Sequence, residues 1–217
     1  MKKMKKIIIL ILCLPFIMFA QDSQKRKDKI KQQSASFETI EIGSNIPKIK
    51  NKLKSVDGDM YSIMPVKENN GLIVIFTCNT CPFVVMWEDR YKLVEEIAKE
   101  NNLDLFYVNS NYKKRDGDDS FEKMQDHAKK MNYQFPYVLD KKSELANKFG
   151  AKTTPHIFLF SNENKLVYKG SIDDNHKDIK SVKKFYLKDA IKQLIAKENV
   201  EPNETKAVGC SIKRYKL

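Results

Sequence analysis

A continuous apolar run, GLIVIFT at residues 71–77, constrains the fold of this chain more than any other feature. The run is rich in β-branched residues and lacks polar alternation, which predicts a strand covered on both faces. Directly after it, from Pro82 to about Lys99, apolar residues recur at helical spacing. A buried strand that leads into an amphipathic helix predicts a layered α/β domain, in which helices cover a sheet.

The rest of the chain continues this alternation. Further strands are expected at 103–110, 135–140, 153–160 and 165–170, and further helices at 120–131, 143–150 and 182–199. An Asp-Gly pair at 57–58, between extended stretches, predicts a hairpin ahead of the first buried strand. Because the strands alternate with helices and end on a strand pair, we expect a central mixed sheet flanked by helices.

The first residues have the layout of a secretory signal peptide. Four lysines precede an apolar run from Ile7 to about Ala20, and this run is short for a membrane span. An uncleaved N-terminal anchor is the alternative. We therefore expect a signal peptide at 1–20, a flexible basic linker at 21–37, a domain at 38–200 and a C-terminal tail at 201–217. This organisation predicts export beyond the cytoplasmic membrane, to the periplasm, with the N-terminal segment near the membrane.

The charge of the chain does not predict a nucleic-acid partner. The formal net charge is +12, with 40 basic and 28 acidic residues. Lysines are mixed with acidic residues over most of the chain, whereas nucleic-acid binding favours a basic stripe with interleaved aromatic residues. We therefore interpret the charge as a solvated surface, and no nucleic-acid partner is expected.

The number of cysteines points to chemistry and not to a disulfide scaffold. Of the four cysteines, Cys13 lies in the predicted signal peptide, which leaves Cys78, Cys81 and Cys210. An odd number outside the cytoplasm means that at least one thiol is free, transiently paired or joined to another chain. A scaffold held by disulfides would carry many more.

Cys78 and Cys81 form a C-x-x-C pair at the predicted junction of strand and helix. A thiol in the first turn of a helix faces unpaired N–H groups and the positive end of the helix dipole, which favour the thiolate. We therefore predict that Cys78 attacks a substrate disulfide. Cys81, one turn deeper, would then resolve the mixed disulfide.

Two other roles for the pair are less favoured. Structural zinc needs four ligands, but Cys210 is alone and the three histidines show no matched spacing. A structural disulfide that closes so small a loop adds little stability, because the stabilisation grows with loop length. No metal and no cofactor are therefore expected, and redox exchange is the preferred reading.

Thr153-Thr154-Pro155 stands just before an apolar strand. Since a proline that opens a strand removes a ladder donor, it needs a reason to be there. We interpret it as a cis bond that places the preceding backbone beside the reactive sulfur, where residue 154 could pair with an extended substrate. An ordinary strand-entry turn is the alternative. Near the end of the chain, Cys210 could be an accessory exchange thiol, an intermolecular bridge or a small apolar plug.

These motifs carry a resemblance to a known family. C-x-x-C at a strand-to-helix turn, followed by T-T-P opening a strand, resembles the thioredoxin-like superfamily. More closely, CNTCPFVVMWEDRY, TPHIFLF, LVYKGSIDDN and GCSIKR look like the exported redoxin group, classed with alkyl hydroperoxide reductase C and thiol-specific antioxidant domains. The resemblance covers about residues 38–214. It implies a thioredoxin-like fold with an N-terminal extension, an inserted strand–helix unit around 115–140, and Pro155 in cis opposite Cys78.

The function expected from these observations is an exported thiol–disulfide oxidoreductase. Its partners would be proteins or small thiols that carry disulfides or dithiols, together with a thiol electron donor or acceptor. A thiol-dependent peroxidase is the first alternative, with Cys81 at the position of the peroxidatic cysteine. In that group a Thr or Ser lies three residues earlier and a Pro further upstream, where this chain has Cys78 and Val74, which speaks against peroxidase activity.

A copper carrier is the second alternative. It would hold Cu(I) with the two cysteines and either His156 or His176, because soft thiolates prefer this ion. The exported carriers of this fold resemble C-x-x-x-C, so the spacing here leans against that role. For His156, a plain strand-edge position is the simpler expectation.

Overall fold

The computed structural model describes residues 38–64 and 67–215. The predicted signal peptide and linker lie outside the described residues. The strands are β1 (Leu53–Ser55), β2 (Met60–Tyr61), β3 (Gly71–Thr77), β4 (Leu103–Asn109), β5 (Tyr137–Leu139), β6 (Thr153–Thr154), β7 (His156–Ser161), β8 (Leu166–Gly170) and β9 (Cys210–Ser211). The helices are α2 (Pro82–Glu100), α3 (Phe121–Met131), α4 (Glu144–Phe149) and α5 (Tyr186–Ile195), with short 3₁₀ turns at η1 (Tyr112–Lys114), η2 (Lys141–Ser143) and η3 (Ile179–Ser181).

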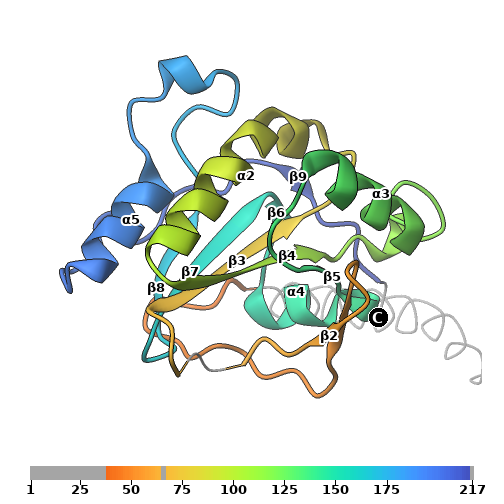
Figure 1. Ribbon diagram of the computed structural model, residues 1–217, viewed down its shortest axis with the longest axis horizontal. Coiled ribbons are helices and arrows are strands. Elements are labelled where there is room, and N and C mark those ends of the chain that lie inside the picture. The colour runs from red at the N-terminus through yellow and green to blue at the C-terminus, as the bar shows by residue number, and fades with distance from the viewer. Residues whose placement is uncertain (1–37, 65–66, 216–217) are drawn as a thin grey trace, which may run out of the picture. The chain divides into compact units, whose positions relative to one another are not determined.

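Seven strands form one mixed sheet in the order β2-β1-β5-β4-β3-β7-β8 (Figure 1). β3 lies near its centre, parallel to β4 and antiparallel to β7. All seven residues of β3 are buried, as its unbroken apolar sequence predicts. The predicted mixed sheet with flanking helices is therefore confirmed.

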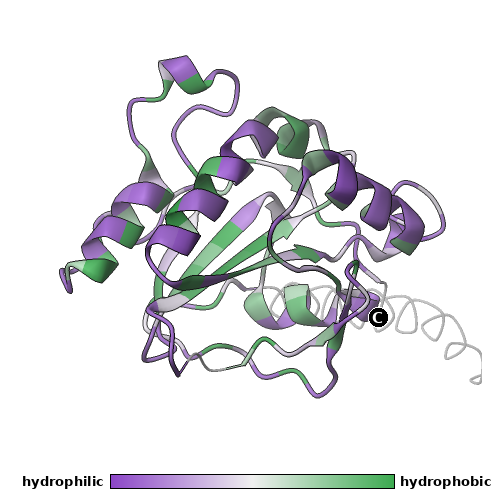
Figure 2. Ribbon diagram, in the orientation of Figure 1, coloured by the Kyte–Doolittle hydropathy of each residue, from purple (hydrophilic) through white to green (hydrophobic). Residues whose placement is uncertain are grey.

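The two faces of β3 belong to two apolar clusters. Ile73 and Ile75 pack in the cluster that includes side chains from α2, α3 and α5. Leu72, Val74 and Phe76 pack in the other cluster, which includes side chains from α4. Figure 2 shows that the central strands are largely apolar and that the helices carry both apolar and hydrophilic residues. Alternate residues of one strand therefore anchor helices on opposite faces.

The predicted hairpin and inserted unit are both present. β1 and β2 pair antiparallel around the 57–58 turn, with Leu53 opposite Tyr61. α3 and β5 form the inserted unit, in which β5 runs parallel to β4. α3 begins after Ser120, whose hydroxyl accepts a hydrogen bond from the N–H of Lys123 at 3.3 Å. The inserted unit thus widens the sheet between β4 and the hairpin.

One helix is shorter than its sequence predicts. A helix was expected at 182–199, but α5 covers only Tyr186–Ile195. The N–H of Lys183 donates to Oδ1 of Asp174 at 2.9 Å, and the N–H of Asp174 donates to the carbonyl of Lys184 at 3.1 Å. These bonds hold the residues before α5 in a loop.

In the part of the chain that the structure describes, no helix is long and apolar enough to cross a membrane.

Residues 201–215, treated as a tail in the sequence analysis, add a strand to the domain. The N–H of Thr205 donates to the carbonyl of Lys169 on β8, at 3.0 Å. Further along, the N–H of Ile212 donates to the carbonyl of Lys152, just before β6, at 3.1 Å. Between these two anchors β9 pairs antiparallel with β6. The end of the chain is therefore fixed on both sides of Cys210.

Candidate active site

The two cysteines of the pair occupy different positions relative to α2. The helix begins at Pro82, so Cys81 is its N-cap, with φ −65° and ψ 125°, while Cys78 lies in the connection from β3. The prediction from the sequence had placed Cys78 in the first turn of this helix. Proline at the first helical position disfavours helical geometry in the residue before it, so the helix begins after Cys81. Cys81, and not Cys78, therefore caps the amino end of the helix.

The structure brings the predicted site residues together. Cys78 and Cys81 are free thiols with exposed fractions of 1% and 6%, and their sulfurs lie within hydrogen-bonding reach of each other. Thr154 contacts both: its Oγ1 lies 3.4 Å from the Cys78 sulfur, and its carbonyl oxygen lies 3.3 Å from the Cys81 sulfur. The peptide bond between Thr154 and Pro155 is cis, as the T-T-P motif predicts.

Hydrogen bonding moves the negative charge of the pair onto Cys81. The hydrogen bond from Cys78 is the largest cause that lowers the pKa of Cys81, to about 4, and it outweighs the opposing effect of burial. The thiol of Cys210 and the backbone N–H of Val84 lower this pKa further. The carbonyl of Thr154 opposes the shift, because it accepts a hydrogen bond only from the protonated thiol. Donors to the sulfur outnumber this one acceptor, so Cys81 carries the thiolate.

The pKa of Cys78 moves in the opposite direction. Its hydrogen bond to Cys81 raises the pKa first, burial raises it further, and the negative charge of Asp119 adds to the effect. The hydroxyl of Thr154 is the opposing influence. Cys78 therefore keeps its proton and donates it toward Cys81, so the pair holds one proton and one negative charge.

A third cysteine lies at the same site. β9 pairs with β6 in a register that places Cys210 opposite Thr154. The half-buried Cys210 sulfur is within hydrogen-bonding reach of Cys81, and burial is the main cause that raises the pKa of Cys210. The sequence analysis expected an extended substrate to pair with the backbone at residue 154. In the structure the chain's own β9 pairs with this backbone, and pairing of a substrate there stays a prediction.

A buried polar network supports the connection between the two cysteines. Oδ1 of Asp119 accepts hydrogen bonds from the backbone N–H of Asn79 at 2.9 Å and from Nδ2 of Asn109 at 2.8 Å. The hydroxyl of Tyr137 donates to Oδ1 of Asn79 at 2.8 Å. Sequence reasoning missed Asp119, which lies in a polar stretch with several other acidic residues. Its position next to the Ser120 helix cap is the only sequence signal that could have pointed to it.

Comparison with known proteins places this site in a family. The family model for Redoxin matches residues 41–185. The chain belongs to the Redoxin family. Its function therefore lies in thiol redox chemistry in general. Among curated proteins, none matches the chain.

Solved structures share the fold of this chain. A hypothetical protein of Sinorhizobium meliloti 1021 is 28% identical with a TM-score of 0.71, and the match covers 82% of this redoxin and 96% of that chain. An uncharacterised conserved protein of Geobacillus kaustophilus is 27% identical with a TM-score of 0.70. This match covers 80% of this redoxin and 92% of that chain. The peroxidoxin BcpB of Mycobacterium tuberculosis, 13% identical with a TM-score of 0.50 and coverage of 61% and 86%, shares the fold.

The histidines of this redoxin do not join the thiols. The ring of His156 packs on Phe158, a member of the cluster on the opposite face from the cysteines. Its Nδ1 accepts the N–H of Lys152 at 3.2 Å, and burial lowers its pKa to about 3. His176 packs against the rings of Phe83 and Trp87. Within 38–64 and 67–215, no group of three or more His, Cys, Asp or Glu could hold a metal ion, which does not favour the copper-carrier alternative.

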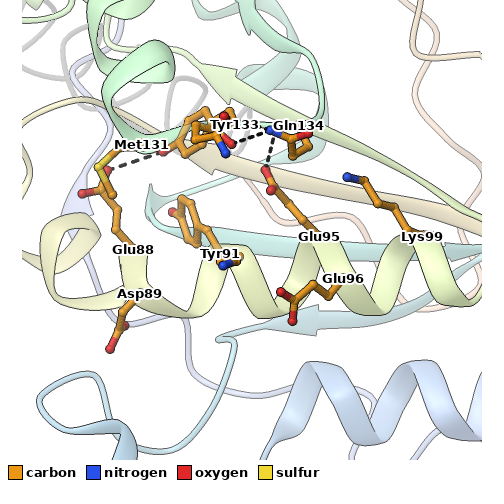
Figure 3. Close-up of a pocket in the computed structure, with 11 residues that line it drawn as sticks. Glu88, Asp89, Tyr91, Glu95, Glu96, Lys99, Met131, Tyr133 and Gln134 are labelled. Carbon is orange, nitrogen blue, oxygen red and sulfur yellow. Dashed lines mark hydrogen bonds between the residues drawn. The ribbon is translucent and has the colours of Figure 1, made fainter.

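A separate pocket of about 490 Å³ lies along α2 (Figure 3). Its buried carboxylates already have partners. Glu88 lies 2.5 Å from Nε2 of His127, and Glu95 accepts the N–H of Gln134 at 3.0 Å. None of the three cysteines that the structure describes lines this pocket. The chemistry of this redoxin therefore centres on the thiols and not on this pocket.

Proposed function

We propose that this redoxin is a thiol–disulfide oxidoreductase that exchanges disulfides with protein or small-thiol partners through Cys78 and Cys81. The observation that carries the proposal is that two buried free thiols, both in contact with Thr154, meet at the amino end of α2, where the pKa of Cys81 is lowered and that of Cys78 is raised. A thiolate is the nucleophile of disulfide exchange, and a second thiol within reach is what resolves the mixed disulfide. The cis bond before Pro155 and the contacts of Thr154 with both sulfurs fit this role.

The sequence analysis assigned the attack to Cys78, and that assignment stays a prediction. Burial and charge support the reverse order. Cys81 is the more exposed of the two and has the lower pKa, so we assign it the first attack. Cys78, nearly sealed from solvent, is placed to act second.

In the reducing direction, this redoxin passes two electrons to a partner disulfide in two thiol-exchange steps. The Cys81 thiolate attacks one sulfur of a partner disulfide, the partner's S–S bond breaks, and the released sulfur takes up a proton. Cys78 then loses its proton and attacks the Cys81 sulfur, which releases the second partner thiol. Two electrons pass from the pair to the partner, and a Cys78–Cys81 disulfide remains. The same steps in reverse oxidise a dithiol partner, and a thiol electron donor or acceptor resets the pair.

Trapping partners tests both the function and the order of attack. In Cys78→Ser, made together with Cys210→Ser so that neither neighbouring thiol can resolve the first mixed disulfide, we expect partners to accumulate on Cys81. In Cys81→Ser, we expect few partners to be trapped. Accumulation only in Cys81→Ser would reverse the order and restore Cys78 as the nucleophile. Absence of mixed disulfides in both variants, with no reduction of disulfides by the wild type, would overturn the proposed function.

A thiol peroxidase is the second candidate, because the Cys81 thiolate at the helix N-cap is also a nucleophile for peroxide. It predicts that purified protein consumes hydrogen peroxide at the expense of a dithiol reductant, and that Cys81→Ser abolishes this turnover. Disulfide reduction without peroxide consumption would leave the oxidoreductase as the function.

Export to the periplasm is part of the proposal as well and rests on the layout of residues 1–20. Fractionation of cells that express the full chain tests it.

A further inference from the structure

The strand that carries Cys210 occupies the edge at which a partner would bind. β9 runs antiparallel to β6, with Cys210 opposite Thr154 and Ser211 opposite Thr153 (Figure 1). Adding an extended strand to a free sheet edge is a common way for a protein to bind a peptide. Here the peptide is the chain's own C-terminal segment, and it carries a cysteine at the position that faces the reactive pair.

The contact between β9 and the site is close and depends on Gly209. A Cβ on this residue would overlap the backbone carbonyl of Thr154 and approach the nitrogen of Pro155 to 3.1 Å. Only glycine allows the backbone of β9 to come this near to the cis peptide. The segment is fixed beyond Cys210 too, because the N–H of Lys213 donates to Oδ1 of Asn111 at 2.8 Å.

Cys81 is thereby the middle one of three sulfurs. Hydrogen bonds from Cys78 and from Cys210 both lower its pKa, so each of these two thiols lies within reach of the same thiolate. The backbone N–H of Phe83, in the first turn of α2, also lowers the pKa of Cys210, although burial and Cys81 raise it overall. Cys210 is the most exposed of the three, being half-buried where the other two are buried.

We propose that Cys210 is a third redox thiol, which takes the disulfide over from the Cys78–Cys81 pair as a Cys81–Cys210 disulfide. The inference rests on the proposed function, in which the first pair becomes oxidised by a partner. Cys210 loses its proton and attacks the Cys81 sulfur, so the Cys81–Cys210 bond forms and the Cys78–Cys81 bond breaks. The released Cys78 sulfur takes up a proton, and no electrons enter or leave. An external dithiol then reduces the new bond by attacking Cys210.

This transfer moves the disulfide to a position where a reductant in solvent can reach one of its sulfurs. A disulfide between Cys78 and Cys81 is buried on both sides, whereas Cys210 presents a half-buried sulfur on a strand at the rim. The exposure of a sulfur and access to it are among the factors that set the rate of thiol exchange. The third thiol therefore separates the sulfur that meets the oxidising partner from the sulfur that meets the reductant.

The test maps disulfides in the full chain. Reduced protein is treated with one equivalent of oxidised glutathione, quenched in acid and alkylated, and its disulfide-linked peptides are identified by mass spectrometry without reduction. In Cys78→Ser we expect an intramolecular Cys81–Cys210 disulfide, and in the wild type both this bond and Cys78–Cys81. If Cys78→Ser keeps glutathione on Cys81 while Cys210 remains a free thiol, the inference is overturned.

A second pair of variants tests whether the position of Cys210 on β9 controls the rate at which the Cys81–Cys210 bond forms. Gly209→Ala, placed in the Cys78→Ser background, should slow formation of the Cys81–Cys210 bond by about 10- to 100-fold, because the added Cβ pushes Cys210 out of line. Gly117→Ala is the matched control, since a Cβ there meets only the carbonyl of Lys114 at 3.8 Å. Equal rates in the two variants would contradict the role of β9. Failure of Cys210→Ser to form Cys78–Cys81 would instead contradict the proposed function.

Discussion

The carboxylate of Asp119 accepts a hydrogen bond from the backbone N–H of Asn79 at 2.9 Å, although the two residues are 40 positions apart in the chain. Through this bond a loop of the inserted unit holds the connection between the two cysteines. The same oxygen accepts from Nδ2 of Asn109, and Oδ2 accepts from Nδ2 of Asn111 at 3.1 Å. A single buried side chain therefore satisfies three donors beneath the reactive thiols.

Replacing this carboxylate should cost stability. In Asp119→Ala the three donors lose their acceptor in a buried setting, and we expect the free energy of unfolding to fall by roughly 3 kcal/mol. The neighbouring Asp118→Ala is the matched control. The Asp118 side chain is 46% exposed and makes only ion pairs at 3.7 Å with lysines, so its loss should cost less than about 1 kcal/mol. Urea denaturation measures both, and equal losses would disprove the structural role of Asp119.

The low pKa of Cys81 should depend on the donor at position 78. Cys78→Ala removes the largest cause of the shift, so we expect the pKa of Cys81 to rise by about 1–2 units. Cys78→Ser keeps a hydroxyl donor and should raise it less. The measurement is the pH dependence of iodoacetamide alkylation at Cys81, followed on its own peptide by mass spectrometry. The prediction fails if the alanine and serine variants leave the pKa of Cys81 where it is in the wild type.

The buried imidazole of His156 should make the protein lose stability in acid. Burial lowers its pKa from 6.5 to about 3, so between these values the unfolded chain binds a proton that the folded protein does not. The contribution of the neutral His156 side chain to the free energy of unfolding is complete above pH 6.5. It decreases as the pH falls toward 3, by up to about 1.4 kcal/mol per pH unit.

His156→Asn provides the comparison. Asparagine offers an acceptor for the N–H of Lys152 but does not titrate, so the free energy of unfolding should depend less on pH in this variant. Denaturation curves between pH 4 and pH 7.5 give the slope for both proteins. Identical slopes would show that His156 is not the group responsible.

The sequence predicted the parts of the fold that depend on local pattern. The boundary of β3 follows from an unbroken apolar run, and the body of α2 follows from the helical spacing of apolar residues after Pro82. The cis bond at Pro155 was inferred from its place before a strand and beside a reactive pair. Each of these features is determined by residues that lie close to it in the sequence.

The parts that were missed depend on pairing between distant segments. β9 has only two residues and pairs with β6 more than 50 positions earlier, so no periodicity reveals it. The lowered pKa of Cys81 has the same origin, because it is set by neighbours that include Cys210. Asp119 is one of several acidic residues in its stretch, and only the fold selects it as the buried one.

The late position of β9 in the chain has a consequence for biosynthesis. A ribosome completes Cys78, Cys81 and Thr154 long before it reaches Cys210. A nascent polypeptide that stops before Cys210 therefore presents β6 without its partner strand, and the pairing forms only after β9 has been made. A truncation that ends before Gly209 should accordingly leave this edge of β6 open in the folded domain.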